Sequence, residues 1–421
     1  MPPPEPAAGT TEGRRATCGG CGLACDDITV VSRGDGGLER LERTCPLGDA
    51  WFAERTAPAP PVARVDGAEV ALDQALDEAA AILGAARAPL VYGLGGTTCE
   101  TQRVAVALAE TIGAVIDPAG PLLDGAAGLA YQTLGASTAT LGDIRDRAEV
   151  VVVWRADPAV THPRLFERLR LPGEHRELVV VDERRTATAE QAGVFLELPA
   201  ERDVEALWTL RALVREAPLA RGPAPDPGLA DLAARLRGCA NGAILHRVRG
   251  HVEALALHSL VRDLARITHV VALLLRREVN AAGAEDVLAW QTGYPTAVSF
   301  APGHPRSAPG ELNAAAVLAR GDADAALVVA SDPLEQLPPD AAEQLRAIPL
   351  VCVDARDTAT ARAARVAFTT AAPGVHRAGV VHRLDGVPVP FRAPLASSRP
   401  GDDELLAALA GRLAAAREAV A

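Results

Sequence analysis

Lysine is absent from this chain of 421 residues, and all 42 of its basic residues are arginine. Mechanisms that depend on a lysine amine, such as Schiff-base formation or a P-loop lysine that binds phosphate, are therefore excluded. The formal net charge of −12 argues against broad binding of nucleic acid. Arginine is therefore the side chain that must supply permanent positive charge to any anion site.

Long apolar runs are missing as well. The longest, Val270 to Leu275, is much shorter than the roughly 20 residues that a membrane helix needs. No charged and then apolar segment opens the chain, so we expect a cytoplasmic protein that does not enter a membrane. The apolar content of 49% and the length predict a large core divided between two or three domains.

Changes in composition divide the chain into segments. Residues 1–16 are rich in proline, alanine, glycine and threonine, which predicts a disordered tail. Residues 17–60 hold four of the seven cysteines and a strand-like run at Ile28 to Val31, which indicates a small antiparallel unit. After it, apolar strands alternate with amphipathic helices, as is typical of parallel α/β sheets. We expect a first α/β domain (61–118 and 250–391), a second (119–249) and a C-terminal helix (392–421).

The sequence also contains an internal repeat. Residues 179–189 (VVVDERRTATA) and 351–361 (VCVDARDTATA) are identical at eight of eleven positions, and a strand ending in Asp-Pro precedes each copy. Two related Rossmann-like halves are therefore expected. An acidic residue at the carboxyl end of a buried strand faces the crevice where such sheets bind nucleotides, and the Arg and Thr that follow can pair with phosphate. The candidate nucleotide-binding residues are Asp182, Arg184, Thr186, Asp354, Arg356 and Thr358. The alternative is a duplicated fold whose loop arginines are only solvated.

Four cysteines form a candidate metal site, with the spacing Cys18-x2-Cys21-x3-Cys25-x19-Cys45. Four thiolates can hold a tetrahedral zinc ion or a [4Fe-4S] cluster. Zinc ribbons favour two C-x2-C pairs, whereas three cysteines in one loop with a distant fourth suit a cluster, whose iron corners need wider spacing than one ion. We therefore predict a [4Fe-4S] cluster, with zinc or no metal as the alternatives.

The cysteine region resembles the cluster motif of the B-type subunit of formylmethanofuran dehydrogenase in two stretches, Cys18-Gly-Gly-Cys-Gly-Leu-Ala-Cys-Asp-Asp-Ile28 and Cys45-Pro-Leu-Gly48. Further blocks similar to this family follow in the family's order over nearly the whole chain. They are residues 98–103, 113–117, 157–158 with 162–164, 290–295 with 309–311, and 382–388. The chain is therefore identified as a member of this family.

The resemblance implies a molybdopterin-oxidoreductase-like α/β fold, with a small N-terminal iron-sulfur domain and two related parallel-sheet domains. It implies one cluster and two molybdopterin guanine dinucleotides, each near one copy of the repeat.

The chain departs from the family at the metal centre. Active members carry Cys-His-Gly after Gly-Ala-Val-Ile-Asp, whereas residues 118–125 here are PAGPLLDG. The resemblance thus places Leu123 where a thiolate or selenolate ligates tungsten or molybdenum, and Asp124 where the histidine stands. Arg276 matches the family's arginine for the substrate carboxylate, but the Gly-His that follows becomes Arg277-Glu278. Leucine has no lone pair for a metal, so we expect neither tungsten nor molybdenum, and whether the pterin still binds is open.

Two functions follow from the resemblance. In the first, the chain is a redox-inactive scaffold in a formyltransferase/hydrolase complex of tetrahydromethanopterin-linked one-carbon metabolism. Its partners would be an amidohydrolase-like A subunit that hydrolyses the formyl amide of methanofuran or an analogue, a formyltransferase subunit and a C subunit. In the second, it is an active tungsten or molybdenum oxidoreductase with Asp124 as metal ligand. We favour the scaffold because two of the three residues for the chemistry have changed. The cysteines then hold either a redox-active cluster or one that only fastens the first domain to the sheet.

Overall fold

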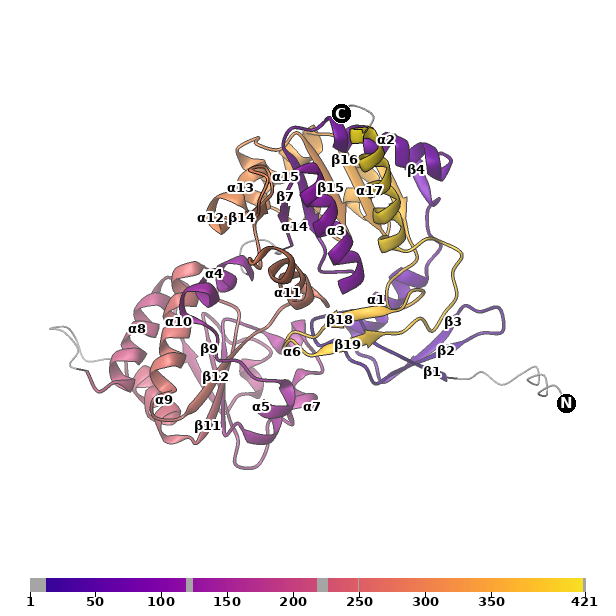
Figure 1. Cartoon of the computed structure of the whole chain (residues 1–421). Helices are drawn as coiled ribbons and strands as arrows, with labels where there is room; N and C mark the ends of the chain where they lie inside the picture. Colours follow the sequence, from indigo (N-terminus) through magenta and orange to yellow (C-terminus); the bar gives the residue numbers. More distant parts are fainter. Residues whose placement is uncertain (1–12, 119–123, 218–225, 249, 419–421) are drawn as a thin grey trace.

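The computed structural model describes residues 13–118, 124–217, 226–248 and 250–418. Two lobes, each built on a largely parallel sheet, lie beside a small antiparallel N-terminal sheet (Figure 1). No helix in these ranges combines the length and the apolar character needed to span a membrane.

The lobe at the lower left of Figure 1 contains a sheet of five parallel strands in the order β10-β9-β8-β11-β12. β8, with the sequence VVVVW, is buried throughout, because helices cover both faces of such a sheet and every side chain meets apolar neighbours. The strands are β8 (Val150–Trp154), β9 (Glu177–Asp182), β10 (Val194–Glu197), β11 (Asn241–His246) and β12 (His269–Leu274). The helices of this lobe are α4 (Asp124–Leu134), α5 (Leu141–Arg147), α6 (Pro158–Thr161), α7 (Leu165–Leu169), η1 (Ala189–Gln191), η2 (Ala200–Arg202), α8 (Asp203–Val214), α9 (Pro227–Gly238) and α10 (His251–Leu264).

The upper lobe contains a nine-stranded sheet in the order β14-β13-β7-β6-β15-β16-β17-β4-β5. Its five central strands are parallel, and the outer strands on both sides are antiparallel. The strands are β4 (Ala63–Val65), β5 (Ala68–Glu69), β6 (Pro89–Gly93), β7 (Val115–Asp117), β13 (Val298–Ser299), β14 (Arg306–Ser307), β15 (Ala325–Val329), β16 (Leu350–Asp354) and β17 (Val366–Thr369). The helices are α2 (Leu72–Ala85), α3 (Cys99–Ile112), α11 (Ala281–Thr292), α12 (Pro309–Leu312), α13 (Ala314–Ala319), α14 (Pro333–Gln336), α15 (Pro339–Ala347), α16 (Ala359–Ala363) and α17 (Asp402–Glu418).

The two lobes repeat one arrangement. β15, β16 and β17 are neighbours in chain order in the upper lobe, as β8, β9 and β10 are in the other, and a further parallel pair lies beside β15 (β6 and β7) and beside β8 (β11 and β12). Arg155 and Ala330, which follow β8 and β15, both have a positive φ, 55° and 50°. The N–H of Arg155 donates to Val181 O (3.0 Å), and that of Ala330 donates to Val353 O (2.8 Å). The repeat seen in residues 179–189 and 351–361 therefore extends over two strands and their connections.

Each copy of the repeat is held to the preceding strand connection by the same pair of hydrogen bonds. Asp157 Oδ1 accepts hydrogen bonds from the N–H and the hydroxyl of Thr188, at 2.9 and 2.5 Å. Asp332 Oδ1 accepts the same pair from Thr360, at 3.0 and 2.5 Å. The Asp-Pro dipeptides and the second threonine of each TATA segment are thus structural partners.

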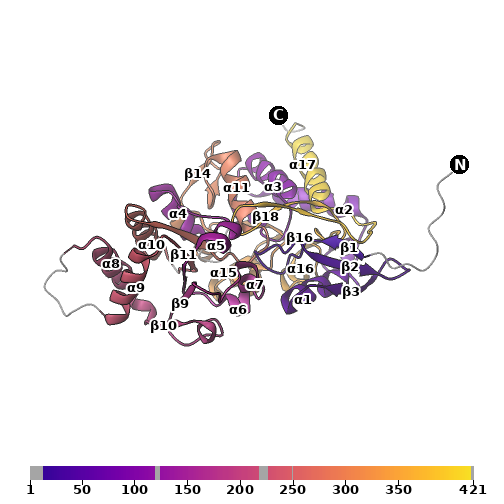
Figure 2. The ribbon, with the colours of Figure 1, turned by 90° about the horizontal axis from the view of Figure 1, so that it is seen from below.

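The N-terminal unit is an antiparallel sheet of β1 (Gly13–Ala16), β2 (Ile28–Ser32) and β3 (Leu38–Glu42), followed by α1 (Pro46–Thr56). Seen from below, it lies at one end of the molecule, away from α8 and α9 (Figure 2). The hairpin of β18 (Gly379–His382) and β19 (Pro388–Phe391) packs against it, and the hydroxyl of Thr17 donates to Pro390 O at 2.7 Å. Residues 13–16 were expected in the tail, but they form β1 because their backbone pairs with β2.

The structure also corrects a domain boundary. The segment 250–274 was expected in the first α/β domain. Instead, β12 pairs in parallel with β11, from Asn241 opposite His269 to His246 opposite Leu274, and α10 packs against α8. Gly250 is the N-cap of α10 rather than a domain junction. The C-terminal helix α17 packs on α2 and α3 of the first domain.

Candidate functional site

A cavity of about 890 Å³ lies at the carboxyl ends of strands from both sheets. Crevices of this kind are where open α/β sheets bind their ligands. The strand ends supply Gly96, Arg247, Arg277, Glu278, Ala330, Ser331 and Arg356, and the cysteine loop and α1 supply Gly19, Gly20, Leu47, Trp51, Glu54 and Arg55. The cavity therefore joins the N-terminal unit to both lobes.

The charge of this cavity is mixed. Four arginines line it, Arg55, Arg247, Arg277 and Arg356, together with three glutamates, Glu54, Glu278 and Glu335. Burial, and then the nearby Arg356 cation, lower the pKa of Arg55 to about 10. The guanidinium of Arg55 lies 4.5 Å from the ring centroid of Trp51, a cation–π contact. Carboxylates of the chain already pair with two of the four arginines, Arg55 with Glu54 and Arg356 with Asp354.

The second copy of the repeat faces this cavity. Arg356 lines it and folds back on Asp354, which is buried: Nε and Nη2 donate to the two carboxylate oxygens at 3.0 and 2.8 Å. Burial acts to lower the pKa of Arg356, but the Asp354 carboxylate outweighs it and raises that pKa. The hydroxyl of Thr358 accepts from Ala361 N and caps α16. Of the three predicted residues, Arg356 is the one that lines the cavity.

The first copy is arranged differently. Asp182 accepts from Glu183 N at 2.7 Å and lies 3.9 Å from Arg155, whose guanidinium is bound more closely by buried Asp203 at 2.7 Å. Arg184 is exposed, and the hydroxyl of Thr186 accepts from Ala189 N. The predicted nucleotide-binding residues of the first copy are therefore arranged differently from those of the second.

The four candidate cluster cysteines converge in the loop between β1 and β2 and at the start of α1. Burial raises the pKa of Cys18 well above its usual value, and Cys25, Cys21 and Cys45 raise it further because their thiolates would repel it. Burial likewise raises the pKa of Cys21 to about 12. Gly20 N donates to Cys18 Sγ at 3.3 Å, and a Cβ on Gly48 would lie 3.0 Å from Cys18 Sγ, which explains the glycine there.

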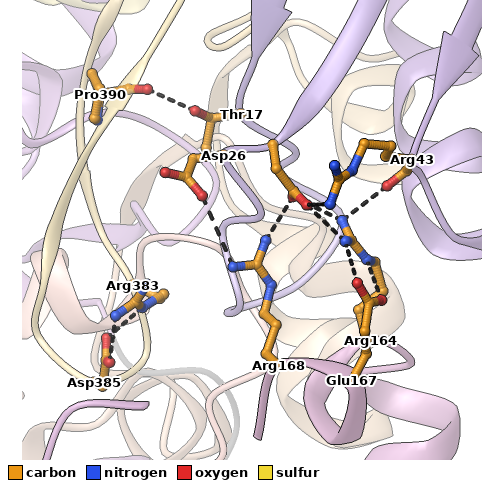
Figure 3. A network of polar contacts seen from close by, with 10 residues as sticks. Thr17, Asp26, Arg43, Arg164, Glu167, Arg168, Arg383, Asp385 and Pro390 are labelled. Atoms are coloured by element: carbon orange, nitrogen blue, oxygen red, sulfur yellow. Dashed lines mark hydrogen bonds and ion pairs between the residues drawn. The ribbon is translucent and has the colours of Figure 1, made fainter. Parts of the chain in front are cut away.

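A network of ion pairs joins this loop to α7 and the residue before it, in the lobe built on β8–β12 (Figure 3). Asp27 accepts from Arg164 at 2.8 Å through each of its oxygens and from Arg168 at 2.7 Å, and Arg43 lies 3.1 Å away. Burial raises the pKa of Cys25, whereas the Arg168 and Arg164 cations oppose that rise. The arginines of α7 and the residue just before it thus place positive charge beside the thiols.

The four thiols do not form a site for a single ion. In the described part of the chain, no three His, Cys, Asp or Glu side chains are grouped so as to hold a metal ion.

The predicted metal-ligand segment is only partly described. Leu123 lies outside the described residues, and α4 begins at Asp124. Arg276 follows β12, and its guanidinium lies 2.6 Å from Glu285 and donates to Leu384 O at 3.3 Å. His162 Nε2 donates to Arg276 O at 2.8 Å, and burial lowers the pKa of His162 to about 4.

Sequence reasoning did not find Arg55, Arg247 and Arg277 as residues of the cavity. Arg247 and Arg277 closely follow β11 and β12, so their positions after apolar strands were the available signal. Arg55 carries no such signal, because it reaches the cavity from α1 through the packing of the N-terminal unit.

No protein-family model matches the chain. The B-type subunit of the tungsten-containing formylmethanofuran dehydrogenase 2 of Methanocaldococcus jannaschii is 32% identical over 404 residues, which cover 90% of this chain and 93% of the relative. The chain belongs to the family of B-type subunits of formylmethanofuran dehydrogenase. The B-type subunit of the formyltransferase/hydrolase complex Fhc of Methylorubrum extorquens is 31% identical over 282 residues, 64% of this chain and 74% of that protein.

A solved structure agrees with membership of this family. A chain of the crystal structure of the Methylorubrum extorquens complex FhcABCD with methylofuran superposes with a TM-score of 0.71 and 27% identity, over 85% of this chain and all of that chain. Acetylene hydratase from Pelobacter acetylenicus gives a TM-score of 0.67 over 95% of this chain and 69% of the other, at 15% identity. The second likeness concerns the fold alone.

Proposed function

We propose that this protein is the B-type subunit of a formyltransferase/hydrolase complex and acts there as a scaffold without redox chemistry of its own. The complex would serve tetrahydromethanopterin-linked one-carbon metabolism in the cytoplasm. Its partners would be an amidohydrolase-like A subunit, a formyltransferase subunit and a C subunit. Membership of the family of B-type subunits supports this proposal.

The observation that carries the loss of redox chemistry is the pairing of Arg276 with Glu285. The resemblance assigns Arg276 to a substrate carboxylate, but its guanidinium contacts two groups of this chain, Glu285 and Leu384 O. Its side chain and that of Glu285 are each only 10% exposed. A carboxylate of the protein thus binds the guanidinium that the resemblance assigns to the substrate, and the same resemblance places Leu123 at the metal-ligand position.

The residues of the cysteine loop fit a [4Fe-4S] cluster. Cys21, Cys25 and Cys45 lie close enough to Cys18 to raise its pKa, a backbone N–H points at the Cys18 sulfur, and two arginines lie beside Cys25. Cys18, Cys21, Cys25 and Cys45 would hold the cluster, which would supply one-electron redox capacity or a structural cross-link. A molybdopterin guanine dinucleotide fits less well, because a glutamate side chain occupies the glycine turn at the edge of the cavity.

Metal analysis tests the proposed function directly. The intact complex, purified from its native source, should contain iron but no stoichiometric tungsten or molybdenum when measured by mass spectrometry. It should also fail to reduce a viologen dye with formate. Stoichiometric tungsten or molybdenum together with formate-dependent dye reduction would instead establish an active oxidoreductase, for which Asp124 is the candidate ligand.

A further inference from the structure

The end of β6 and the turn that leads to α3 contain three glycines, each approached closely by a neighbour. A Cβ on Gly93, whose φ is 110°, would lie 2.3 Å from Val329 O, and one on Gly96 would lie 2.5 Å from Ala330 O. A Cβ on Gly95 would lie 1.7 Å from Glu278 Oε2. Backbone atoms thus cover two of these glycines, whereas a carboxylate covers the third.

In a parallel sheet, a glycine turn of this kind is a place for phosphate. Glycine lets the ligand approach the backbone, and the positive end of the following helix attracts the negative charge. Here the turn leads into α3, a helix of 14 residues, and Gly96 lines the cavity of about 890 Å³. The space over Gly95 that a phosphate would need is filled by Glu278, and Gly95 is buried beneath it.

The backbone around Glu278 fixes it in this place. Asn280 N donates to Gly95 O at 2.9 Å, so the segment after β12 is tied to the turn. The Asn280 side chain donates to Thr97 O at 2.7 Å, just beyond the turn. Glu278 therefore reaches Gly95 from a backbone that is hydrogen-bonded to the turn close to the contact.

We propose that Glu278 is a built-in anion that occupies the phosphate position over Gly95 and so excludes a phosphorylated pterin cofactor from the cavity. A carboxylate and a phosphate oxygen are both negative acceptors, so they repel each other when they are placed side by side. Arg247 and Arg277 of the cavity wall carry charge of the sign that such a ligand needs, but Glu278 already fills the space over Gly95. This inference rests on the proposed function, since a subunit without metal chemistry has no need of the cofactor.

Binding of inorganic pyrophosphate to the intact complex tests this inference. Isothermal titration calorimetry would compare the wild type with Glu278→Gly, which opens the space over Gly95, and with Glu278→Gln, which keeps the bulk and removes the charge. Removal of a like-charge contact should tighten binding by about tenfold or more in Glu278→Gly, with a smaller gain in Glu278→Gln. If Glu278→Gly fails to fold, a gain in Glu278→Gln carries the test.

The matched control is Glu335→Gln, which removes the same charge from the wall of the same cavity but not from Gly95. It should bind pyrophosphate as the wild type does. Equal affinity in the wild type and the Glu278 variants, binding by none of them, or an equal gain in Glu335→Gln would overturn the inference. Those outcomes leave the proposed function standing, because that function fails only if tungsten or molybdenum is present in the unaltered complex.

Discussion

Arg276 Nη2 lies 2.6 Å from Glu285 Oε2, and both side chains are nearly out of contact with solvent. A buried ion pair of this kind adds little net stability, because the desolvation of two charges offsets their attraction. Loss of one partner, however, leaves an uncompensated charge in a medium that solvates it poorly. The pair therefore gives different results for single and double substitutions.

We expect Glu285→Gln to lower the free energy of unfolding by about 3–5 kcal/mol, because Arg276 is left without its counter-charge. The double variant Arg276→Met with Glu285→Gln should recover most of that loss, since both charges are gone. Urea denaturation of the purified subunit or complex measures both values. A single variant as stable as the wild type would show that Arg276 can find another anion, which would restore its candidacy as a substrate-binding residue.

Replacement of one cysteine should remove the cluster. Cys21→Ser is expected to lower iron from about four atoms per chain towards zero, because a cubane needs all four of its thiolate ligands. Elemental analysis and the visible absorption of the purified complex follow the loss. Cys239→Ser is the matched control, since Cys239 lies at the end of α9, far in sequence from the loop, and should leave iron unchanged. Iron that survives Cys21→Ser would contradict the assignment of Cys21 as a ligand.

The same experiment distinguishes a redox-active from a structural cluster. If Cys21→Ser also abolishes solubility or assembly of the complex, the cluster fastens the N-terminal unit to the lobes. Asp27→Asn then serves as a second test of that junction. It weakens the contacts with Arg164 and Arg168 while leaving all four thiols in place.

The Thr–Asp hydrogen bonds of the two copies of the repeat should contribute similar amounts to the free energy of unfolding. Thr360→Val removes the hydroxyl that donates to Asp332 and accepts from Leu334 N, and it keeps the shape of the side chain at a position that is fully buried. The loss of the hydrogen bond to a charged acceptor, together with the weaker one from a backbone N–H, should cost at least about 1.5–3 kcal/mol in thermal or chemical unfolding. Thr188→Val, the equivalent change in the other lobe, should cost a similar amount. A cost confined to one of them would mean that the duplicated contacts have diverged in energy.

Much of this fold could be predicted from the sequence because its signals are local. Apolar runs such as Val150–Trp154 indicated buried parallel strands, and the repeat at 179–189 and 351–361 indicated two related halves. The boundary near residue 250 could not be placed, because the pairing of β11 with β12 depends on which of two sheets accepts a strand, and a strand's own sequence does not specify that. Residues 13–16 were placed in the tail for a similar reason, because their strand depends on pairing with β2, which their own sequence does not specify.

The candidate site was only partly predictable. Cysteine spacing pointed to one end of the cavity, and the Asp-x-Arg motif pointed to Arg356 at another. The two copies of that motif place their arginines differently: Arg356 binds Asp354, whereas Arg184 is exposed. Identical residues in a repeat therefore do not determine the direction of a side chain. The contact of Glu278 with Gly95 joins residues 183 positions apart and needed the structure.

We expect two buried histidines to make the lobe built on β8–β12 less stable in acid. His246, at the end of β11, and His258, on α10, lie with ring centroids 5.5 Å apart, and Tyr131 of α4 packs on His258 at 4.8 Å. Burial lowers the pKa of His258 to about 4, and burial followed by the His258 and Arg276 charges lowers that of His246 well below its usual value. Both rings are therefore neutral in the folded protein near neutral pH.

Because these pKa values are lower in the folded than in the unfolded chain, the unfolded chain binds protons first as the pH falls below about 6.5. The stability that depends on neutral histidine is complete above that pH and is lost progressively between about 6.5 and 4, by about 1.4 kcal/mol per pH unit for each histidine. His258→Phe keeps the edge-to-face packing and removes one of the titrating groups, so its free energy of unfolding should fall less steeply over this range. Urea denaturation of both forms at a series of pH values gives the two slopes, and identical slopes would mean that His258 is protonated as readily in the folded chain as in the unfolded one.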